Sequence, residues 1–414
     1  MKLTLDSKAF VEAVAWVTKN YDAKDTKAYV SLSVAEDGKA IVSHESRSSY
    51  IQTELALINT DFTGDSVNKA DLALDGRFLQ RLSGALSGTS GEIVLSKKLD
   101  DNKTVDDMDD FEDEDSHEEI VGKSTPLQVK TSSGTFTVPV FHAAPSKQPK
   151  IVEFGEVLEV ELFDSLQRVA KLTDVANASV LPALGCVDIR LSAEDETLSM
   201  MTTDRFAMSE ITLDFAPTDN GELENHNIDI LLPYDSAITV PASKNTGDSV
   251  KVVYAPKTKK FGFSFTDGRI ALFSLESADP LEYKPLIEHA NETVEHSMIV
   301  STNDLKKAVA NVSNLSWEEN MIWMNISESG DLTVTDQHQT NVQKVEGTDA
   351  EIEGDFRVSF NRAVLNKAFS PISTSRVQLR WLNESKQFCF SLVLDDDTIA
   401  DNVFILVQPS VEND

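Results

Sequence analysis

A short apolar strand, a polar residue and an amphipathic helix follow one another three times along the chain. The copies read LTLDSKAFVEAVAWV (3–17), VELFDSLQRVAKLT (160–173) and IVSTNDLKKAVANVS (299–313). Their apolar residues recur at three- and four-residue spacing, which predicts helices that begin where strands end. The first and third copies align without a gap over Leu5, Phe10, Ala13, Val14 and Val17 with Val300, Leu305, Ala308, Val309 and Val312, whereas the middle copy needs a one-residue shift. The spacing of the copies favours tandem similar domains over a solenoid.

A second strand–helix pattern lies between these copies, at 72–86, 230–243 and 356–369. Period-two runs separated by turn dipeptides fill the remaining sequence, which predicts antiparallel hairpins. These dipeptides are Asp37-Gly38, Asp267-Gly268 and Ser329-Gly330. The predicted organisation is therefore six strand–helix–strands units, two in each domain.

Domain boundaries follow from linker-like composition near 142–156 and 282–296. We predict an α+β protein of three similar domains, at 1–150, 151–292 and 293–414. The first domain is longer chiefly because it carries an acidic segment at 100–119.

The formal net charge is −32, which taken alone argues against a nucleic-acid partner. The acid is unevenly spread, since residues 100–119 hold twelve carboxylates and one base, Lys103. We expect this segment to be a solvated loop. It has no glycine, and a calcium loop needs one at its sharp turn.

The predicted helices are more basic than the chain around them. Taken as 6–18, 75–85, 162–173, 233–244, 303–314 and 361–371, they carry a combined formal charge of +4. Besides Lys8, their bases are Arg77, Arg81, Arg168, Lys171, Lys244, Lys306, Lys307, Arg362 and Lys367. Residue by residue these are ordinary helix-surface charges, but as a set they suggest one concave face for a polyanion, with phosphate contacts that carry no sequence information.

The sequence contains no recognisable catalytic, metal or cofactor constellation. Phosphate-binding glycine loops and metal-ligand pairs of histidine are absent. Asp204 and Asp336 each follow a threonine at a strand end, and we interpret them as turn-capping residues rather than an acid–base pair. Cys186 and Cys389 are expected to be buried thiols. With no membrane-length apolar run and no signal peptide, we expect a cytoplasmic, non-catalytic protein without cofactors.

In joint order, several motifs resemble the bacterial-type sliding clamp, the β subunit of DNA polymerase III. They are the triplicated helix starts, TTDRFAMSEI, NRAVLNKAF and the strand VFILVQP. The resemblance covers the whole chain. It implies two chains closed head to tail into a ring, helices lining a hole for duplex DNA, and a tethered replicative polymerase. A separate clamp loader would open the ring, and the host could be a bacterium or a virus.

The resemblance also implies a cleft for a linear peptide of the polymerase and loader. Its walls are expected to be Ala183, Thr203, Arg205, Phe206, Met208, Val403, Phe404, Ile405, Leu406 and Val407. Two departures alter the details. Arg205-Phe206 stands where small or basic residues are common in the family, and the last strand continues into SVEND.

Two further sets of residues are implied by the resemblance. Lys24 occupies a position of DNA contact, although Asp22 and Asp25 flank it. Phe136 is expected at the homodimer interface, opposite Val312, Leu315 and Trp317. Core packing of Phe136 within its strand is an equal alternative.

Two other functions are weighed against the clamp. An acidic DNA mimic or protein scaffold would not need its helix bases to converge. The clamp requires these bases to point to one face, whereas unrelated directions would favour the mimic; the bases that decide this are Arg168, Lys171, Lys306 and Arg362. A hydrolase would need Asp204 and Asp336 for chemistry.

Overall fold

The computed structural model describes most of the chain. The described residues are 1–19, 29–34, 39–61, 70–97, 125–141, 146–218, 228–239, 248–292, 295–316, 320–382 and 388–410. They form two compact units, Met1–Glu153 with Val250–Ser274, and Phe154–Ser249 with Leu275–Asp414. The acidic segment 100–119 and the Asp37-Gly38 dipeptide lie outside the described residues.

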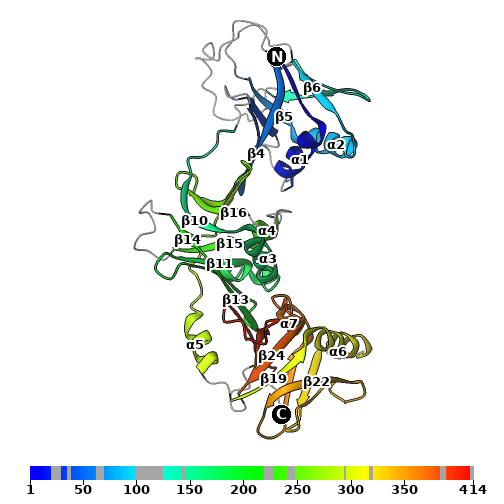
Figure 1. Cartoon of the computed structure of the whole chain (residues 1–414), viewed down its shortest axis with the longest axis vertical. Helices are drawn as coiled ribbons and strands as arrows, with labels where there is room; N and C mark the ends of the chain where they lie inside the picture. Colours follow the sequence, from blue (N-terminus) through cyan, green and yellow to red (C-terminus); the bar gives the residue numbers. More distant parts are fainter. Residues whose placement is uncertain are drawn as a thin grey trace. The chain divides into compact units, whose positions relative to one another are not determined.

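Among the described residues, unit 1 contains two helices and two groups of strands, one from the N-terminal part of the chain and one from 250–274. Its elements are β1 (Lys2–Asp6), α1 (Ser7–Val17), β2 (Tyr29–Val34), β3 (Lys39–Glu45), β4 (Ser49–Asp61), β5 (Ala70–Asp75), α2 (Gly76–Leu86), β6 (Glu92–Ser96), β7 (Leu127–Thr131), β8 (Gly134–Val138), β9 (Val140–Phe141), β16 (Ser249–Ala255), β17 (Lys260–Phe265) and β18 (Ile270–Ser274). Figure 1 shows α1 and α2 side by side against its strands.

The strands of unit 1 pair antiparallel in the order β16-β17-β18-β4-β1-β6-β7-β8, and β2, β3, β5 and β9 extend the network from β4. The β17–β18 hairpin turns at Asp267-Gly268, as predicted, with Gly268 at φ +84°, where a residue without a Cβ is unstrained. Strand β18 pairs with β4 from Ile270↔Gln52 to Phe273↔Ser49. Lys260 secures this junction, because its buried Nζ donates to the carbonyl oxygens of Ser46 and Ser49.

Unit 2 contains the remaining helices and a continuous antiparallel sheet. Its elements are β10 (Val152–Leu158, which begins in unit 1), α3 (Glu159–Ala170), short 3₁₀ helices at Val175–Asn177 and Pro182–Gly185, β11 (Cys186–Ser192), β12 (Thr197–Thr203), β13 (Ala207–Asp214), β14 (Ala216–Pro217), β15 (Ile228–Pro233), α4 (Tyr234–Thr239), α5 (Lys284–Glu292), β19 (His296–Ser301), α6 (Thr302–Leu315), β20 (Met321–Ile326), β21 (Asp331–Thr335), β22 (Val342–Glu351), β23 (Phe356–Asn361), α7 (Arg362–Ala368), β24 (Arg376–Trp381), β25 (Phe388–Val393) and β26 (Val403–Val407).

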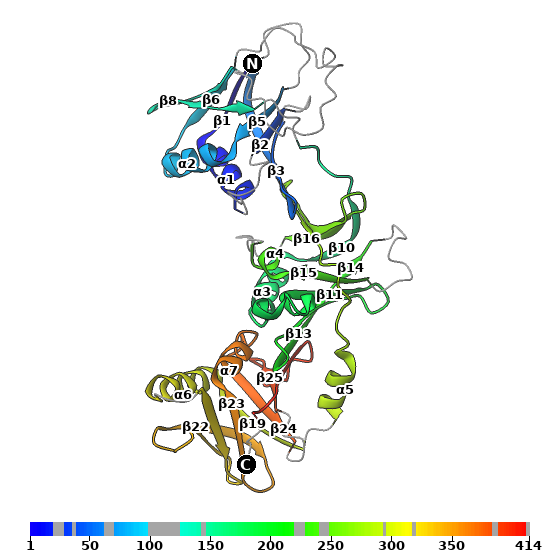
Figure 2. The ribbon, with the colours of Figure 1, turned by 180° about the vertical axis from the view of Figure 1, so that it is seen from behind.

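The sheet of unit 2 has 12 strands in the order β15-β11-β12-β13-β26-β25-β24-β19-β22-β21-β20-β23. Strand β26 joins its two halves, since it pairs with β13 from Ala207↔Val407 to Ile211↔Val403 and also with β25. Helices α3, α4, α6 and α7 lie on one face of this sheet, and α5 lies on the opposite face (Figure 2). The β20–β21 hairpin turns at the predicted Ser329-Gly330.

The repeated strand–cap–helix pattern is confirmed at four helix starts. The side chains of Asp6, Asp75, Ser301 and Asn361 each accept a hydrogen bond from a backbone N–H in the first turn of the following helix. All ten apolar residues matched between the first and third copies are buried. One local rule therefore generates the same unit at both ends of the chain.

Helix α3 differs from the prediction, because it begins at Glu159 instead of Leu162 and ends at Ala170. Its N-cap, Leu158, offers no side-chain hydrogen bond, and Glu159 and Glu161 occupy the first turn, where the helix dipole favours acids. These residues make α3 net acidic, which corrects the positive charge assigned to its predicted span. Helix α4 is described only to Thr239.

Helix α5 was not predicted at all. Its segment, near the expected second linker, contains Pro285 within the first turn, and a proline is tolerated there because the first N–H groups of a helix have no intrahelical partner. The boundaries at 1–150, 151–292 and 293–414 stay a prediction.

Candidate partner-binding pocket and basic helix surface

A pocket of about 500 Å³ lies in unit 2 where the β12–β13 turn, the end of β26 and the segment before α5 meet. Six of the ten predicted cleft residues line it: Thr203, Arg205, Phe206, Met208, Leu406 and Val407. The lining also includes Ala207, Leu281, Glu282, Tyr283, Leu286, Gln408 and Pro409, which the sequence did not indicate. The pocket is mainly apolar with a few polar groups at its rim, which is typical of peptide-binding sites.

The Thr-Asp pair builds the turn on which this pocket depends. Asp204 Oδ1 accepts hydrogen bonds from the backbone N–H groups of Phe206 (3.1 Å) and Ala207 (2.8 Å). Thr203 Oγ1 accepts from Arg205 N over 3.0 Å, and the Phe206 carbonyl accepts from Gln408 N over 2.7 Å. The turn is thus tied to the end of β26, and Phe206 keeps 52% of its surface exposed.

The wall formed by the α5 segment packs into the core. Tyr283 and Ala290 belong to one buried cluster with Met201, Met208, Cys389 and Phe404. Burial raises the pKa of the Tyr283 hydroxyl, and the nearby Asp188 adds to this effect. A helical stripe, Tyr283, Ile287 and Ala290, was present in the sequence and could have revealed this wall, but Pro285 obscured it.

Four predicted cleft residues lie elsewhere. Ala183 is buried with Cys186 and Leu231, while Val403, Phe404 and Ile405 are not part of the pocket lining. The predicted cleft included the five consecutive strand residues 403–407. Successive side chains of a strand point to opposite faces, so they cannot all face one pocket. Register places Leu406 opposite Met208 and Phe404 opposite Glu210, so Ile405 between them points to the helix-bearing face.

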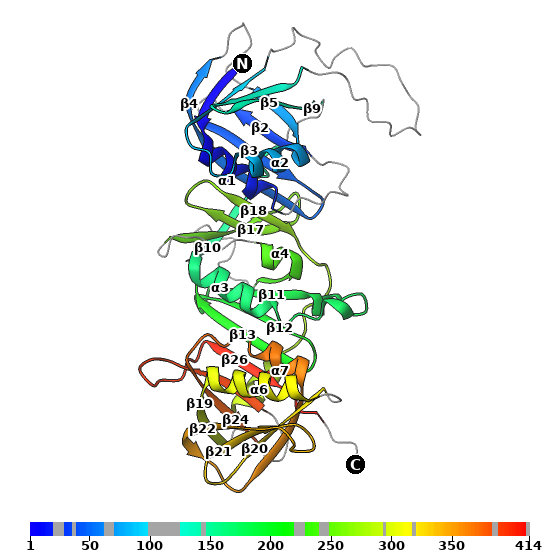
Figure 3. The same ribbon diagram turned by 90° about the vertical axis from the view of Figure 1, so that its right-hand side faces the viewer.

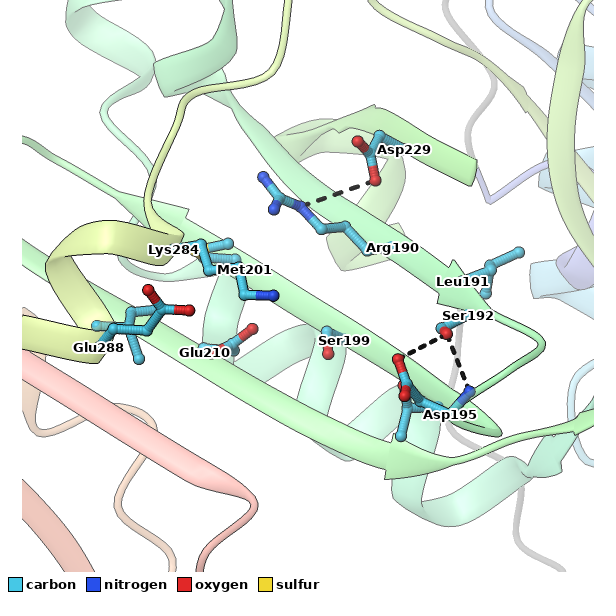
Figure 4. A pocket seen from close by; sticks show the side chains of 12 residues that line it. Arg190, Leu191, Ser192, Asp195, Ser199, Met201, Glu210, Asp229, Lys284 and Glu288 are labelled. Carbon is cyan, nitrogen blue, oxygen red and sulfur yellow. Dashed lines mark hydrogen bonds and ion pairs between the residues drawn. The ribbon is translucent and has the colours of Figure 1, made fainter. Parts of the chain in front are cut away.

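A second, polar pocket of about 360 Å³ lies on the other side of α5 (Figure 4). Its floor is the exposed face of β11, β12 and β13, with Arg190 beside Asp229 and Ser192 beside Asp195. Arg190 Nη2 donates to Asp188 Oδ2 (2.9 Å) and to the Leu281 carbonyl oxygen (3.2 Å). This arginine therefore links the sheet to the wall of the first pocket.

The predicted helix bases divide into two groups. Arg168 donates to the Pro371 carbonyl oxygen over 2.9 Å and pairs with Asp164 over 3.1 Å, while Arg362 donates to the Ser313 carbonyl oxygen over 2.8 Å. These two guanidinium groups join helices to neighbouring segments. Lys171 and Lys307 instead lie on the surface of unit 2.

Three elements of unit 2 bring their bases together. Lys306 of α6 donates to the Ile372 carbonyl oxygen, and Lys367 of α7 donates to the Thr173 carbonyl oxygen and pairs with Asp204 at 3.4 Å. Burial, and to a smaller extent the positive charge of Lys171, lower the pKa of Lys306. Lys171 and Arg168 therefore lie near Lys306 and Lys367. Figure 3 shows the helices α3, α6 and α7, which carry or adjoin these residues, on one face of the unit 2 sheet.

The remaining predicted DNA contacts are in unit 1 or outside the described residues. Arg77 and Arg81 are exposed on α2. Lys24 and Lys244 lie outside the described ranges.

The predicted interface residues have different environments. Phe136 is half-buried on β8, the terminal strand of the unit 1 sheet path. Leu315, at the end of α6, is 55% exposed. Val312 is fully buried, so it packs in the core and offers no surface to a partner. Trp317 is not among the described residues.

The two strand-end aspartates occupy structural turns, as predicted. Asp336 accepts hydrogen bonds from the backbone N–H groups of Thr340 (2.7 Å) and Asn341 (3.1 Å), as Asp204 does in its own repeat. Both cysteines are buried free thiols, as predicted, and burial raises the pKa of Cys389 to about 11. Within the described ranges, no helix combines the length and the apolar character of a membrane span.

The arrangement of repeated units, antiparallel sheets and helices defines the α+β fold of the DNA sliding clamps, with three tandem similar domains. The whole chain superposes on the Helicobacter pylori beta clamp bound to a DNA ligase peptide, with a TM-score of 0.71, 15% identity and coverage of 99% of this chain and 100% of that one. The Pseudomonas aeruginosa DNA polymerase sliding clamp gives a TM-score of 0.75 at 13% identity, with 100% of both chains covered.

The Bacillus subtilis sliding clamp gives a TM-score of 0.74 at 13% identity, with coverage of 100% of this chain and 99% of that one. No protein-family model and no curated protein sequence matches the chain. The likeness therefore establishes the fold, and it confirms the resemblance noted in the sequence motifs.

Proposed function

We propose that the protein is a DNA sliding clamp: a head-to-tail ring of two copies that encircles duplex DNA and tethers a replicative polymerase. The observation that carries this proposal is the likeness to sliding clamps over the full length of the chain, with 99% or more of both chains covered. A partial likeness would have been compatible with many functions of a single domain. Domains at 1–150, 151–292 and 293–414 would supply three sectors of the ring from each copy.

The distribution of charge supports an inner DNA-facing surface. In a chain with a net charge of −32, bases from α3, α6 and α7 gather on the helix-bearing face of unit 2. The exposed Lys171 and Lys307, with Arg77 and Arg81 of α2, are the best candidates for phosphate contacts. A closed ring needs only weak contacts of this kind, because it cannot dissociate sideways from the duplex.

The apolar pocket beside Phe206 supports binding of partner proteins through a linear peptide. The Helicobacter pylori clamp in the comparison carries a DNA ligase peptide. In this chain we assign the pocket to the polymerase and to a clamp loader, whose large apolar side chains would enter it. Tethering raises the local concentration of the polymerase at the primer end. The protein would act in the cytoplasm without catalysis or a cofactor.

A topological assay tests the proposal. The protein, with the loader of its host, is incubated with nicked circular plasmid and the DNA-bound fraction is isolated by gel filtration. The clamp function predicts retention on the circle and loss of the protein after a restriction enzyme linearises it. Retention that survives linearisation would indicate ordinary binding and contradict the ring. Native mass spectrometry should show two 45.6 kDa chains in the particle.

The acidic DNA mimic is the other candidate, and the convergence of Arg168, Lys171 and Lys306 disfavours it. A mimic would bind DNA-binding proteins and would not bind the plasmid in either form. The same gel-filtration experiment therefore separates the two functions.

A further inference from the structure

The backbone of Arg205 is strained at the rim of the apolar pocket. This residue lies in the β12–β13 turn at φ +77°, in the left-handed region that favours glycine. The side-chain oxygens of Thr203 and Asp204 hold it there, because they accept hydrogen bonds from the backbone N–H groups of Arg205 and Ala207. Strained residues of this kind cluster at ligand-binding sites, where the surrounding structure keeps them in place.

Arg205 carries a positive charge in a pocket whose described lining is mainly apolar. Among the described residues that line the pocket, Arg205 is the only base and Glu282 is the only acid. The Arg205 side chain is 52% exposed and contacts Asp174 Oδ2 at 3.5 Å. That oxygen already accepts a shorter, 2.7 Å hydrogen bond from Asn177. An exposed and long ion pair contributes little, so the guanidinium is available to a ligand.

Phe206 places an apolar surface beside this cation. The Arg205 guanidinium carbon lies 5.8 Å from the centroid of the Phe206 ring, and this ring is itself half exposed. A peptide that inserts an apolar side chain against Phe206 therefore passes its neighbouring residue close to Arg205. The planar guanidinium can bind a carboxylate through two parallel hydrogen bonds.

We propose that Arg205 is a specificity residue of the pocket, and that it binds the carboxylate of an acidic side chain adjacent to the apolar anchors of the partner peptide. This inference rests on the proposed peptide-binding function. A chain with a net charge of −32 repels acidic peptides at long range, so the preference comes from the short-range contact and acts on the dissociation rate.

The test compares two synthetic fluorescent peptides by anisotropy with the full-length protein. Both carry the same leucine and phenylalanine anchors and an amidated C-terminus. They differ only in one residue next to the anchors, which is Glu in one peptide and Gln in the other. The comparison is made once with this residue before the anchors and once with it after them. We expect the Glu peptide to bind about fivefold more tightly on one side. In Arg205→Gln, the difference in affinity between the Glu and Gln peptides should disappear.

A charge swap and a matched variant complete the design. Arg205→Glu should prefer a third peptide with Lys at the same position. Lys257→Gln, which removes an equal charge from an exposed turn that does not line the pocket, should keep the Glu preference. Circular dichroism verifies that each variant is folded.

The outcomes separate the two claims. If the native protein binds both peptides with equal affinity, or if Arg205→Gln keeps the preference, the role of Arg205 is wrong while the peptide pocket stands. If no anchor peptide binds at all, the peptide-binding function itself fails, and the role of Arg205 with it.

Discussion

Arg190 donates a hydrogen bond to Asp188 over 2.9 Å on the face of the sheet that α5 covers, where the Asp188 side chain is 2% exposed. Burial raises the pKa of the Asp188 carboxyl, and the hydrogen bond from Arg190 opposes this increase. The same guanidinium also donates to the Leu281 carbonyl oxygen at the pocket wall. An ion pair with a buried carboxylate therefore supports the segment that forms one wall of the apolar pocket.

Removing one member of this pair should be costly. Arg190→Met leaves the Asp188 charge buried without its partner, and we expect it to lower the free energy of unfolding by about 3 kcal/mol. The double variant Asp188→Leu/Arg190→Met, which removes both charges, should recover most of the loss. Urea unfolding followed by circular dichroism measures both values.

The exposed pair Lys8–Glu12 provides the control, with a separation of 4.0 Å on α1. Lys8→Met should change the unfolding free energy by less than about 0.5 kcal/mol. An equal effect of Lys8→Met and Arg190→Met would show that burial of Asp188 does not determine the energy of its ion pair.

Relief of backbone strain gives a second prediction. Arg205→Gly introduces glycine, which adopts a φ of +77° without strain. We expect this variant to raise the unfolding free energy by about 1 kcal/mol. Arg205→Ala loses the same side-chain contacts but keeps a Cβ, so it should give no such gain. Thermal unfolding of both variants tests this; equal melting temperatures would argue against strain at this position.

The pocket can be tested by a change that leaves the core intact. Phe206→Ala removes a half-exposed ring, so we expect about tenfold weaker binding of a peptide with leucine and phenylalanine anchors and no loss of stability. Leu394→Ala is the matched control, because Leu394 is 41% exposed in a turn that does not line the pocket. Titration of the labelled peptide into each variant gives the dissociation constants. Deleting residues 405–414 tests the pocket less specifically than Phe206→Ala, because the deletion also removes part of β26 from the sheet.

The helix bases should separate into structural and DNA-contacting residues. Arg168→Ala loses a hydrogen bond to Pro371 from a side chain that is 18% exposed, so it should lower the unfolding free energy by about 1.5 kcal/mol. Lys171→Glu and Lys307→Glu, at the surface, should leave stability unchanged and reduce retention on circular plasmid. Denaturation and gel filtration of the same preparations test both effects. Undiminished retention would contradict the DNA-facing assignment of α3 and α6.

Lys306 provides a pH-dependent test of convergence. Its pKa is lowered by burial and by Lys171, so the folded state binds fewer protons than the unfolded state between the lowered value and 10.5. Stability from this group is therefore gained as pH rises through that window. Lys171→Gln should raise the pKa of Lys306 and weaken this gain. NMR titration of ¹³C-methylated lysines measures the pKa, and an unchanged value would mean that the two ammonium groups do not interact.

The sequence predicted the elements that follow local rules. Capping residues such as Asp6 and Asn361 and the apolar stripes behind them are local signals, so the helix starts were found to within one residue except at α3 and at α5, which was not predicted. Thr203, Arg205 and Phe206, which the family resemblance placed in a cleft, line the apolar pocket, and their role in peptide binding stays a prediction. Tyr283 belongs to a helical stripe that Pro285 obscured. Leu281 could not be found from local patterns, because its place in the pocket depends on the hydrogen bond from Arg190 and on packing against buried clusters. Such contacts link distant segments and leave no periodic trace.

Strand β26 also determines when the pocket can first exist during synthesis. Asn402, just before this strand, hydrogen bonds to the Thr212 carbonyl oxygen across 190 residues of chain, and the Met208↔Leu406 pair closes a loop of similar length. During synthesis, the part of the pocket wall formed by β12 and β13 therefore stays incomplete until β26 has left the ribosome. If the pocket binds partner peptides as proposed, a chain can bind them only after β13 and β26 have paired.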